Sequence, residues 1–226
     1  MISLGTSNPA GTAGIVPAAG LSTRMGRPKQ LLAARGRILL AHVLKTVLDS
    51  PLDPVILVLG RRAREIEKAL AGPEGLEPAD LARVSIVINP LFRTGQASSI
   101  KAGLGALGPE VQAALFVMGD QAGLKQSVIA AVLERGLAAP GPVAARPYYG
   151  GVPDGPVFWS KKFFPLLMTL EGDQGGRSLF SRLAPEELIR LDLPAEDRPA
   201  DVDDPDDFER WRLELGGKKI PGPKFT

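Results

Sequence analysis

Four short apolar segments in the first half of the chain predict the strands of one β-sheet. They are residues 14–18, 54–60, 83–89 and 113–120, with the sequences GIVPA, PVILVLG, RVSIVIN and AALFVMGD. Each is a nearly uninterrupted apolar run, which is typical of strands buried on both faces of a parallel sheet. We therefore expect all four to be buried on both faces of a mainly parallel sheet.

Amphipathic segments alternate with these strands and predict helices. They cover residues 38–48, 62–71, 98–107 and 127–137. Regular alternation of strand and helix is typical of a parallel sheet with helices on both faces. The pattern predicts a three-layer α/β/α fold of the Rossmann-like type, with a mainly parallel sheet and mixed strands at its edge.

The alternation weakens after residue 140. Residues 140–173 are rich in Gly, Pro and aromatic residues, which favours either an insertion that covers a substrate or a set of edge strands. Three further elements are predicted after this region: a helix at 176–183, a strand at 188–193 and a helix at 205–215. With no linker in sight, we expect a single domain over residues 1–226, with flexible tails at 1–11 and 216–226.

The composition excludes several kinds of catalytic and metal site. The 226 residues include no cysteine, which excludes disulfides, thiolate metal sites and a cysteine nucleophile. The single histidine, His42, argues against a histidine-rich metal site or a Ser-His-Asp relay. His42 falls within a predicted amphipathic helix, and we expect it to be structural.

Charge and hydropathy bear on partners and location. The formal net charge of +2 argues against a nucleic-acid-binding surface. No apolar run approaches the ~20 residues that span a bilayer, so we expect no membrane partner. The first residues lack the basic and apolar regions of a signal peptide, so the expected location is cytoplasmic.

Glycines and cations gather in the loop after the first predicted strand, AAGLSTRMGRPK. Gly20 lets the backbone approach a ligand closely, and Arg24 and Lys29 supply positive charge. The spacing matches neither a P-loop nor a dinucleotide-binding motif. On spacing alone, an anion-binding loop and a solvated surface turn are equally open.

Two acidic segments follow other predicted strands: Asp120 ends AALFVMGD, and Asp203 lies in DVDDPDD. Ligands of parallel sheets collect beyond the carboxyl ends of the strands, so we expect the first loop, Asp120 and Asp203 along one edge. Both segments also have simpler interpretations. Asp120 could cap the next helix, and the acidic run could be a helix start with Asp203 or Asp204 as N-cap and Pro205 at its first position.

These segments together resemble the motifs of the MobA-like nucleotidyltransferases, the superfamily with the molybdopterin-guanine dinucleotide biosynthesis fold. PAAGLSTRMGRPKQLL is similar to the signature [LP]-A-[AG]-G-x-S-x-R-M-G-x-x-K. TGQASSIKAGL, FVMGDQAGL, EGDQGGRSLF and DVDDPDDF resemble later motifs in the same order. Within the superfamily, the chain is most similar to molybdenum cofactor cytidylyltransferases. The resemblance implies transfer of CMP from CTP to molybdenum-bearing molybdopterin, with release of pyrophosphate.

The resemblance also implies roles for individual residues. The nucleotide-binding set would be Ala18, Ala19, Gly20, Ser22, Arg24, Lys29, Ser99, Gly119 and Asp120. Within it, Arg24, Lys29 and Asp120 would be catalytic, because phosphoryl-type transfer depends mainly on electrostatic stabilisation. Asp120 and Asp203 would hold Mg²⁺, the expected cofactor, with Asp201 as a further candidate ligand.

The pair Ala18-Ala19 bears on the base. Guanylyltransferase relatives usually have A-G-G at these positions and cytidylyltransferases have A-A-G, so an added methyl group favours a pyrimidine. Ser99 matches a family serine near the base. Ser98 and Ser99 could instead cap the N-terminus of a helix.

The acceptor side rests on a later motif. Asp173 and Arg177 match a family segment near the pterin substrate, where Arg177 could pair with the substrate's phosphate. Arg146 and the pair Tyr148-Tyr149 could line the same pocket or pack as an edge strand.

The chain departs from the family pattern at two positions: Ala122 replaces the usual proline after GDQ, and Gly155 stands where a histidine is often found. The second falls in the acceptor region and keeps the acceptor open. One alternative is the same fold with GTP, or with a sugar or polyol phosphate as acceptor. Another is a non-catalytic carrier or chaperone of the molybdenum cofactor. A molybdoenzyme or its chaperone is a further expected partner.

Overall fold

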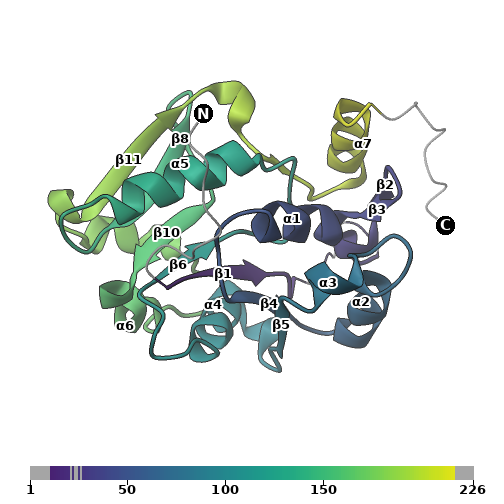
Figure 1. The fold of residues 1–226 in the computed structure, drawn as a ribbon, viewed down its shortest axis with the longest axis horizontal. Coiled ribbons are helices and arrows are strands. Elements are labelled where there is room, and N and C mark those ends of the chain that lie inside the picture. Colours follow the sequence, from purple (N-terminus) through teal and green to yellow (C-terminus); the bar gives the residue numbers. More distant parts are fainter. Residues whose placement is uncertain (1–10, 21, 23–24, 26, 217–226) are drawn as a thin grey trace.

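A mostly parallel sheet runs through the middle of the computed structural model, which describes residues 11–216 apart from 21, 23, 24 and 26 (Figure 1). Its strand order is β11-β8-β10-β6-β1-β4-β5. The four strands predicted first are β1 (Thr12–Pro17), β4 (Val55–Leu59), β5 (Val84–Ile88) and β6 (Ala113–Phe116). They are parallel neighbours, which confirms the mainly parallel sheet.

Residues 140–173 contribute strands to the interior of the sheet. The remaining strands are β8 (Ala144–Tyr149), β9 (Val152–Pro153), β10 (Val157–Ser160) and β11 (Leu188–Leu193). Strand β10 is antiparallel to both β6 and β8, whereas β11 is parallel to β8 and forms the edge. The alternative of edge strands was therefore wrong for β8 and β10, which lie between β11 and β6 with Ala145 and Phe158 buried. That this region covers a substrate stays a prediction.

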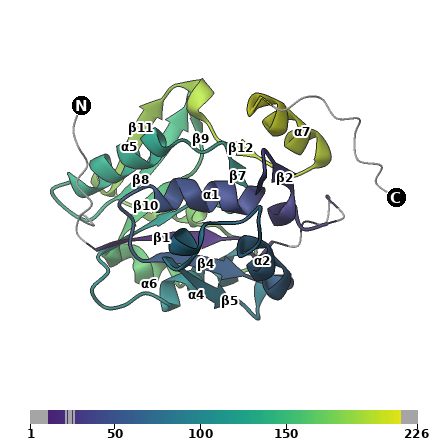
Figure 2. The same cartoon turned by 45° about the vertical axis from the view of Figure 1, so that its right-hand side comes forward.

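Helices cover both faces of this sheet (Figure 2). The helices are α1 (Leu39–Leu48), α2 (Ala63–Leu70), α3 (Pro78–Leu81), α4 (Gln96–Gly105), α5 (Gln126–Leu137), α6 (Phe164–Leu167) and α7 (Pro205–Glu214). Helices α1, α2, α5 and α7 share one core cluster with Val16 of β1, and α4 and α6 share the other with Ile15. Adjacent residues of β1 thus face opposite layers, which confirms the three-layer α/β/α fold.

Short elements complete the chain. Two-residue strands form two small ladders, β2 (Ala33–Ala34) with β3 (Arg37–Ile38), and β7 (Gln121–Ala122) with β12 (Ala200–Asp201). Short 3₁₀ helices lie at Lys29–Leu31, Phe92–Thr94, Lys161–Phe163, Gly176–Arg182, Pro185–Glu187 and Ala195–Asp197. The helix expected at 176–183 is thus a 3₁₀ helix. The predicted tails fall almost wholly outside the described residues.

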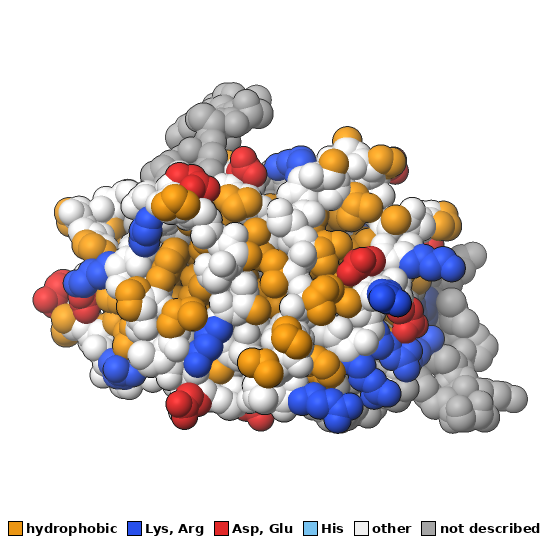
Figure 3. All heavy atoms as spheres, turned by 90° about the horizontal axis from the view of Figure 1, so that it is seen from below, with side chains coloured by type: hydrophobic (Ala, Val, Ile, Leu, Met, Phe, Trp, Pro, Cys, Tyr) orange, Lys and Arg blue, Asp and Glu red, His pale blue; other side chains and the backbone are white. Residues whose placement is uncertain are grey.

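Strand β5 corrects one expectation about burial. It is the last strand of the sheet, and among the described strands it pairs only with β4. Ile88 in β5 is 51% exposed and Leu91 after it is 61% exposed, so the prediction that this strand is buried on both faces was wrong. Figure 3, which views the molecule from below, shows apolar side chains spread over the surface on this side.

His42 joins two helices. Its Nε2 lies 2.9 Å from the carbonyl oxygen of Ala34, and its ring meets that of Trp211 edge-on at 5.3 Å. Since His42 is in α1 and Trp211 in α7, the expected structural role of this histidine is confirmed. No helix in the described part of the chain is long and apolar enough to cross a membrane.

Candidate active site

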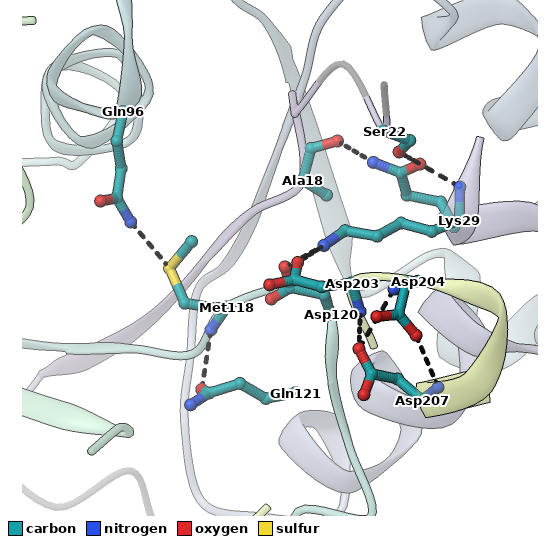
Figure 4. A network of polar contacts seen from close by, with 11 residues as sticks. Ala18, Ser22, Lys29, Gln96, Met118, Asp120, Gln121, Asp203, Asp204 and Asp207 are labelled. Atoms are coloured by element: carbon teal, nitrogen blue, oxygen red, sulfur yellow. Dashed lines mark hydrogen bonds and ion pairs between the residues drawn. The ribbon is translucent and has the colours of Figure 1, made fainter. Parts of the chain in front are cut away.

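Lys29 stands between two carboxylates beyond the carboxyl ends of the parallel strands. Its Nζ donates to Oδ2 of Asp120 at 2.5 Å and to Oδ1 of Asp203 at 2.8 Å (Figure 4). Lys29 follows β1, Asp120 follows β6 and Asp203 precedes α7. The structure therefore brings together the three segments that were expected to share one edge of the sheet.

The two carboxylates keep Lys29 charged. Its side chain is only 12% exposed. Burial alone would lower the pKa of Lys29, but the charges and hydrogen bonds of Asp120 and Asp203 outweigh it and raise the pKa above its usual value of 10.5. The ammonium group is thus a fixed positive charge at neutral pH.

A small ladder holds the two aspartates together. Strand β7 pairs with β12, and the amide of Val202 donates to the carbonyl oxygen of Asp120 at 3.2 Å. The amide of Ala122 donates to the same oxygen at 2.8 Å. The proline that is usual in the family at this position would lack that N–H group. Ala122 therefore adds a hydrogen bond to the turn that carries Asp120.

Neighbouring residues of the acidic run DVDDPDD have different contacts. Asp204 is the N-cap of α7: its carboxylate accepts from the amide of Asp207 at 2.9 Å, and Pro205 is the first helical residue. Asp203 instead faces Lys29. The helix-start interpretation thus holds for Asp204, while the side chain of Asp203 contributes to the site.

Ser22 and Gln30 shape the first loop. Ser22 has a positive φ of 50°, and its Oγ accepts from the amide of Lys29 at 3.2 Å. The buried side chain of Gln30 donates to the carbonyl oxygen of Ala18 at 2.8 Å. Gln30 was not anticipated, although its position directly after Lys29 in the motif was an available signal. Arg24 lies outside the described residues.

Three adjoining cavities run past Lys29, and together we call them the trough. The first measures about 250 Å³ and the second about 170 Å³, and they share Ala18, Gly20, Ser22 and Gln30. The third measures about 410 Å³ and shares Pro17, Met118, Asp120 and Asp203 with the second. The pair of aspartates therefore lies where the second and third cavities meet.

The first two cavities collect most of the residues predicted to bind the nucleotide. The described members of that set that line them are Ala18, Ala19, Gly20, Ser22, Lys29, Gly119 and Asp120. Arg27, Arg61 and Arg62 line the first cavity as well and were not anticipated. The last two follow β4, so the rule about carboxyl ends of strands was a signal for them.

Ser99 lies apart from this set. It is 6% exposed, accepts from Nδ2 of Asn89 at 3.1 Å, and lines none of the three cavities. Neither serine caps the helix, because α4 begins at Gln96 after Gly95, and the Oγ of Ser98 donates to the carbonyl oxygen of Gly95. The capping alternative was therefore wrong, and a role for Ser99 in base binding stays a prediction.

The third cavity receives part of the predicted acceptor set. Arg177, Arg146 and Gly155 line it, whereas Asp173 does not and is exposed. Tyr149 is buried in the core and donates its hydroxyl to the carbonyl oxygen of Gly155 at 2.8 Å. Tyr149 therefore supports the wall of the cavity from behind.

Asp154, Arg198 and Asp201 line the third cavity too. Nε of Arg198 donates to Oδ2 of Asp154 at 2.7 Å. Much of Asp201 is exposed, yet partial removal of its carboxyl from water raises its pKa to about 7, helped by the charges of Asp154, Asp120 and Asp203. The sequence had singled out only Asp201. Arg198 follows β11, which was a usable signal, but nothing marked Asp154.

The donor set fits a divalent ion that brings other ligands with it. In the described ranges, no group of three or more His, Asp or Glu side chains surrounds a common point. Asp120 and Asp203, however, already face one shared cation, the ammonium of Lys29. Mg²⁺ is commonly held by one or two carboxylates, with phosphates and water as the other ligands. These two residues are therefore compatible with such a site.

Comparisons with known proteins bear on this arrangement. The MobA-like NTP transferase domain matches residues 14–187. Molybdenum cofactor cytidylyltransferase of Escherichia coli (strain K12) is 26% identical over 194 residues, 86% of this chain and 92% of that protein. Nicotine blue oxidoreductase of Paenarthrobacter nicotinovorans is 30% identical over 201 residues, 84% of this chain and 91% of that protein.

One similar solved structure contains a bound metal. The crystal structure of Rv0371C from Mycobacterium tuberculosis H37Rv in complex with manganese has a TM-score of 0.70 and 25% identity, and covers 89% of this chain and 97% of that one. A relative of the same fold thus binds a divalent ion. Fold, motif order and family match agree: the chain belongs to the MobA-like NTP transferase family of nucleotidyltransferases.

Proposed function

We propose that this protein transfers CMP from CTP to the phosphate of molybdenum-bearing molybdopterin, with Mg²⁺ and with release of pyrophosphate. The observation that carries the proposal is the bridge from Lys29 to Asp120 and Asp203 in the middle of the trough. The nucleotide would occupy the first two cavities and the acceptor the third. The similarity to the cytidylyltransferase of Escherichia coli supports the choice of reaction.

The chemistry needs charge neutralisation more than proton transfer. An oxygen of the acceptor phosphate attacks the α-phosphorus of CTP, the bond from that phosphorus to the bridging oxygen breaks, and pyrophosphate leaves with the electron pair. A phosphate monoester is already anionic near neutral pH, because its second pKa is about 6. No general base is required, which suits a chain whose single histidine is structural.

Lys29 would stabilise the charge that builds up during this displacement. Its ammonium group is held rigidly by two carboxylates and stays protonated. Loss of one such positioned donor costs ~3–4 kcal/mol of transition-state stabilisation in comparable cases. Arg24 is the second cation proposed for this role.

Asp120 and Asp203 would hold the divalent ion. When bound, Mg²⁺ would supply positive charge to the triphosphate. The manganese-bound relative supports the use of a divalent ion in this family. Asp201, at the edge of the same cavity, is the next candidate ligand.

The wall of the first cavity supports a pyrimidine base. Ala18 and Ala19 are buried and line that cavity. Ala18 is also backed closely, since a Cβ added at Gly119 would lie only 2.7 Å from the Cβ of Ala18. The wall therefore has little room to yield to the larger ring system of a purine.

A second candidate is the same transfer to a different acceptor. Gly155 lines the third cavity at the position where these enzymes often carry histidine, so the acceptor contacts differ there. The relative from Paenarthrobacter nicotinovorans has a name that describes another activity, which supports a second candidate. A carrier without catalytic activity is less compatible with the intact set of Lys29, Asp120 and Asp203.

Pyrophosphate release tests the proposal. With Mg²⁺ and molybdenum-bearing molybdopterin, kcat/KM should be higher for CTP than for GTP by about 10–200-fold, the usual value of one steric mismatch in a packed pocket. Ala19→Gly should narrow that gap, mainly by improving GTP. A wild type that prefers GTP would refute the cytidylyltransferase assignment. No pyrophosphate from any nucleotide would favour the carrier.

A further inference from the structure

Arg146 is a buried arginine whose guanidinium has no hydrogen-bonded partner in the described part of the chain. It lies in β8, is 7% exposed and lines the third cavity of the trough. Its buried Nε makes no hydrogen bond. Buried charged donors without partners are costly, so a stable fold does not place one inside without a compensating gain.

Aromatic rings hold the guanidinium without using its N–H groups. The central carbon of Arg146 lies 4.9 Å from the ring centroid of Phe180 and 5.8 Å from that of Tyr148. Cation–π contacts of this kind position the plane of the group while its donors remain at the edge. The side chain is therefore oriented and still able to bind an acceptor of hydrogen bonds.

The surrounding charges leave room for an anion. Burial lowers the pKa of Arg146, and the charge of nearby Arg177 lowers it further. The charge of Asp154 acts in the opposite direction on the pKa of Arg146, but the carboxylate of Asp154 is already paired with Arg198 at 2.7 Å. Arg146 and Arg177 thus share a cavity in which the carboxylate of Asp154 already has another arginine as its partner.

We propose that Arg146 binds an oxyanion in the third cavity, a phosphate-type group of the acceptor substrate, with Arg177 beside it. A guanidinium matches such a group because two parallel N–H donors can bind two of its oxygens. This assignment makes Arg146 a specificity-determining residue and predicts that acceptors without an anionic group bind poorly. That the ligand is the acceptor rests on the proposed function, whereas oxyanion binding by Arg146 does not.

Thermal stability separates this role from a structural one. Arg146→Met removes the unpaired donors and keeps an apolar stem against Phe180 and Tyr148. If Arg146 serves a ligand, the Tm without ligand should stay unchanged or rise, since replacing buried charge by a well-packed apolar side chain is often neutral or stabilising. A fall of more than about 4 °C would show that Arg146 supports the fold, and would overturn the inference.

Direct binding of inorganic phosphate is the main test. Titration calorimetry is done in a Lys29→Ala background, so that Lys29 does not contribute to phosphate binding. Adding Arg146→Met should weaken phosphate affinity at least tenfold, and Arg146→Lys should weaken it less. Arg190→Met is the matched control, because Arg190 lies 4.0 Å over Tyr148 but is exposed and does not line the cavity. Equal phosphate affinity with and without Arg146 would overturn the inference.

Kinetics then link the anion site to the reaction. In the protein with Lys29 intact, Arg146→Met should raise KM for the acceptor at least tenfold and leave KM for CTP unchanged. Equal changes in both constants would contradict an acceptor role. Phosphate binding that depends on Arg146, in a protein that releases no pyrophosphate, would refute the proposed function and support the anion site. Normal pyrophosphate release with unchanged acceptor KM in Arg146→Met would support the proposed function and overturn the assignment of Arg146 to the acceptor.

Discussion

Lys29 forms ion pairs with two carboxylates from different parts of the chain, those of Asp120 and Asp203. Asp120 and Asp203 would repel each other at this separation if no cation lay between them, so the ammonium group supports the site even before a substrate binds. The same positive charge is then available to phosphate oxygens. One residue thus links the stability of the empty site to the chemistry proposed for it.

Lys29→Ala should lower turnover by about 10²–10³-fold, as loss of a positioned donor does in comparable sites. Binding of cytidine, which lacks phosphates, should be unaffected. Lys45→Ala is a matched control, because Lys45 also contacts two aspartates, Asp49 and Asp80, but lies in α1 away from the trough. The measurements are pyrophosphate release and cytidine affinity. Equal loss of cytidine and CTP binding would show that the substitution disorders the loop.

Asp203 and Asp204 are adjacent residues with different expected roles. Asp204→Ala removes the N-cap of α7 and should cost about 1 kcal/mol, or a fall in Tm of about 2–4 °C, with turnover retained. Asp203→Ala should abolish turnover with a smaller change in Tm. Thermal melting and pyrophosphate release are measured on both variants. Normal turnover in Asp203→Ala with unchanged Mg²⁺ dependence would move the second ligand elsewhere, first to Asp201.

At the scale of elements, two features fix α7 against the rest of the fold. The β7–β12 ladder brings its N-terminus to Asp120, and the contact of Trp211 with His42 docks it on α1. The helix therefore acts as a support that carries Asp203 to Lys29. Weakening the contact between His42 and Trp211 should lower the stability of the fold more than it lowers turnover.

The pH dependence of stability should report on His42, the single histidine. Burial, with a smaller contribution from the charge of Arg37, lowers the pKa of His42 below its usual 6.5. The unfolded chain then takes up the proton first, so stability is complete above pH 6.5 and falls as the pH drops through the folded pKa. The loss should stay below about 1 kcal/mol, because the ring is only half-buried.

Urea unfolding of wild type and His42→Gln at about pH 5 and pH 7.5 measures this effect. Wild type should lose more stability than His42→Gln on acidification, since the variant cannot take up that proton. Comparing the two removes the contributions of Asp201 and other carboxyls, which both proteins share. Identical pH slopes would contradict the assignment.

Hydrophobic periodicity predicted most elements but not their neighbours. Apolar residues at a fixed period identified the main helices, and short, nearly uninterrupted apolar runs identified β1, β4, β5 and β6. Strand β5 was expected to be buried on both faces, which was wrong. The composition of residues 140–173 favoured a covering insertion or edge strands, whereas β8 and β10 lie inside the sheet. Strand order depends on which side chains meet across the sheet, and a single strand's pattern does not contain that information.

At the scale of the whole molecule, some residues of the site could be predicted from the sequence and others could not. The proximity of Lys29, Asp120 and Asp203 could be predicted because the carboxyl ends of parallel strands meet at one edge of the sheet. Asp154 and the unpaired guanidinium of Arg146 could not, because their surroundings depend on how β8, β9 and β10 fold against β6. Ser99, chosen through resemblance, lies outside the trough because Asn89 holds it in the core.

The continuity of the trough makes nucleotide binding a property of the whole molecule. The loop that carries Ala18, Ala19 and Lys29 lines the trough together with Asp120 and Asp203, which are distant in sequence, so a ligand that contacts all of them opposes global unfolding. A ligand at 100 times its Kd adds about 2.7 kcal/mol, which corresponds to a rise in Tm of about 5–11 °C for a protein of this size.

Thermal melting with Mg²⁺ and each of CTP, UTP, GTP and ATP tests this expectation. CTP should give the largest rise, because the proposed base pocket at Ala18 and Ala19 would disfavour purines and a wrong base would leave buried polar groups unpaired. Lys29→Ala should reduce the rise with CTP and leave the small rise with cytidine unchanged, which separates triphosphate contacts from base contacts. Equal rises for all four nucleotides would show that the trough recognises only the triphosphate. A larger rise with GTP would mean that the two alanines do not limit the base pocket.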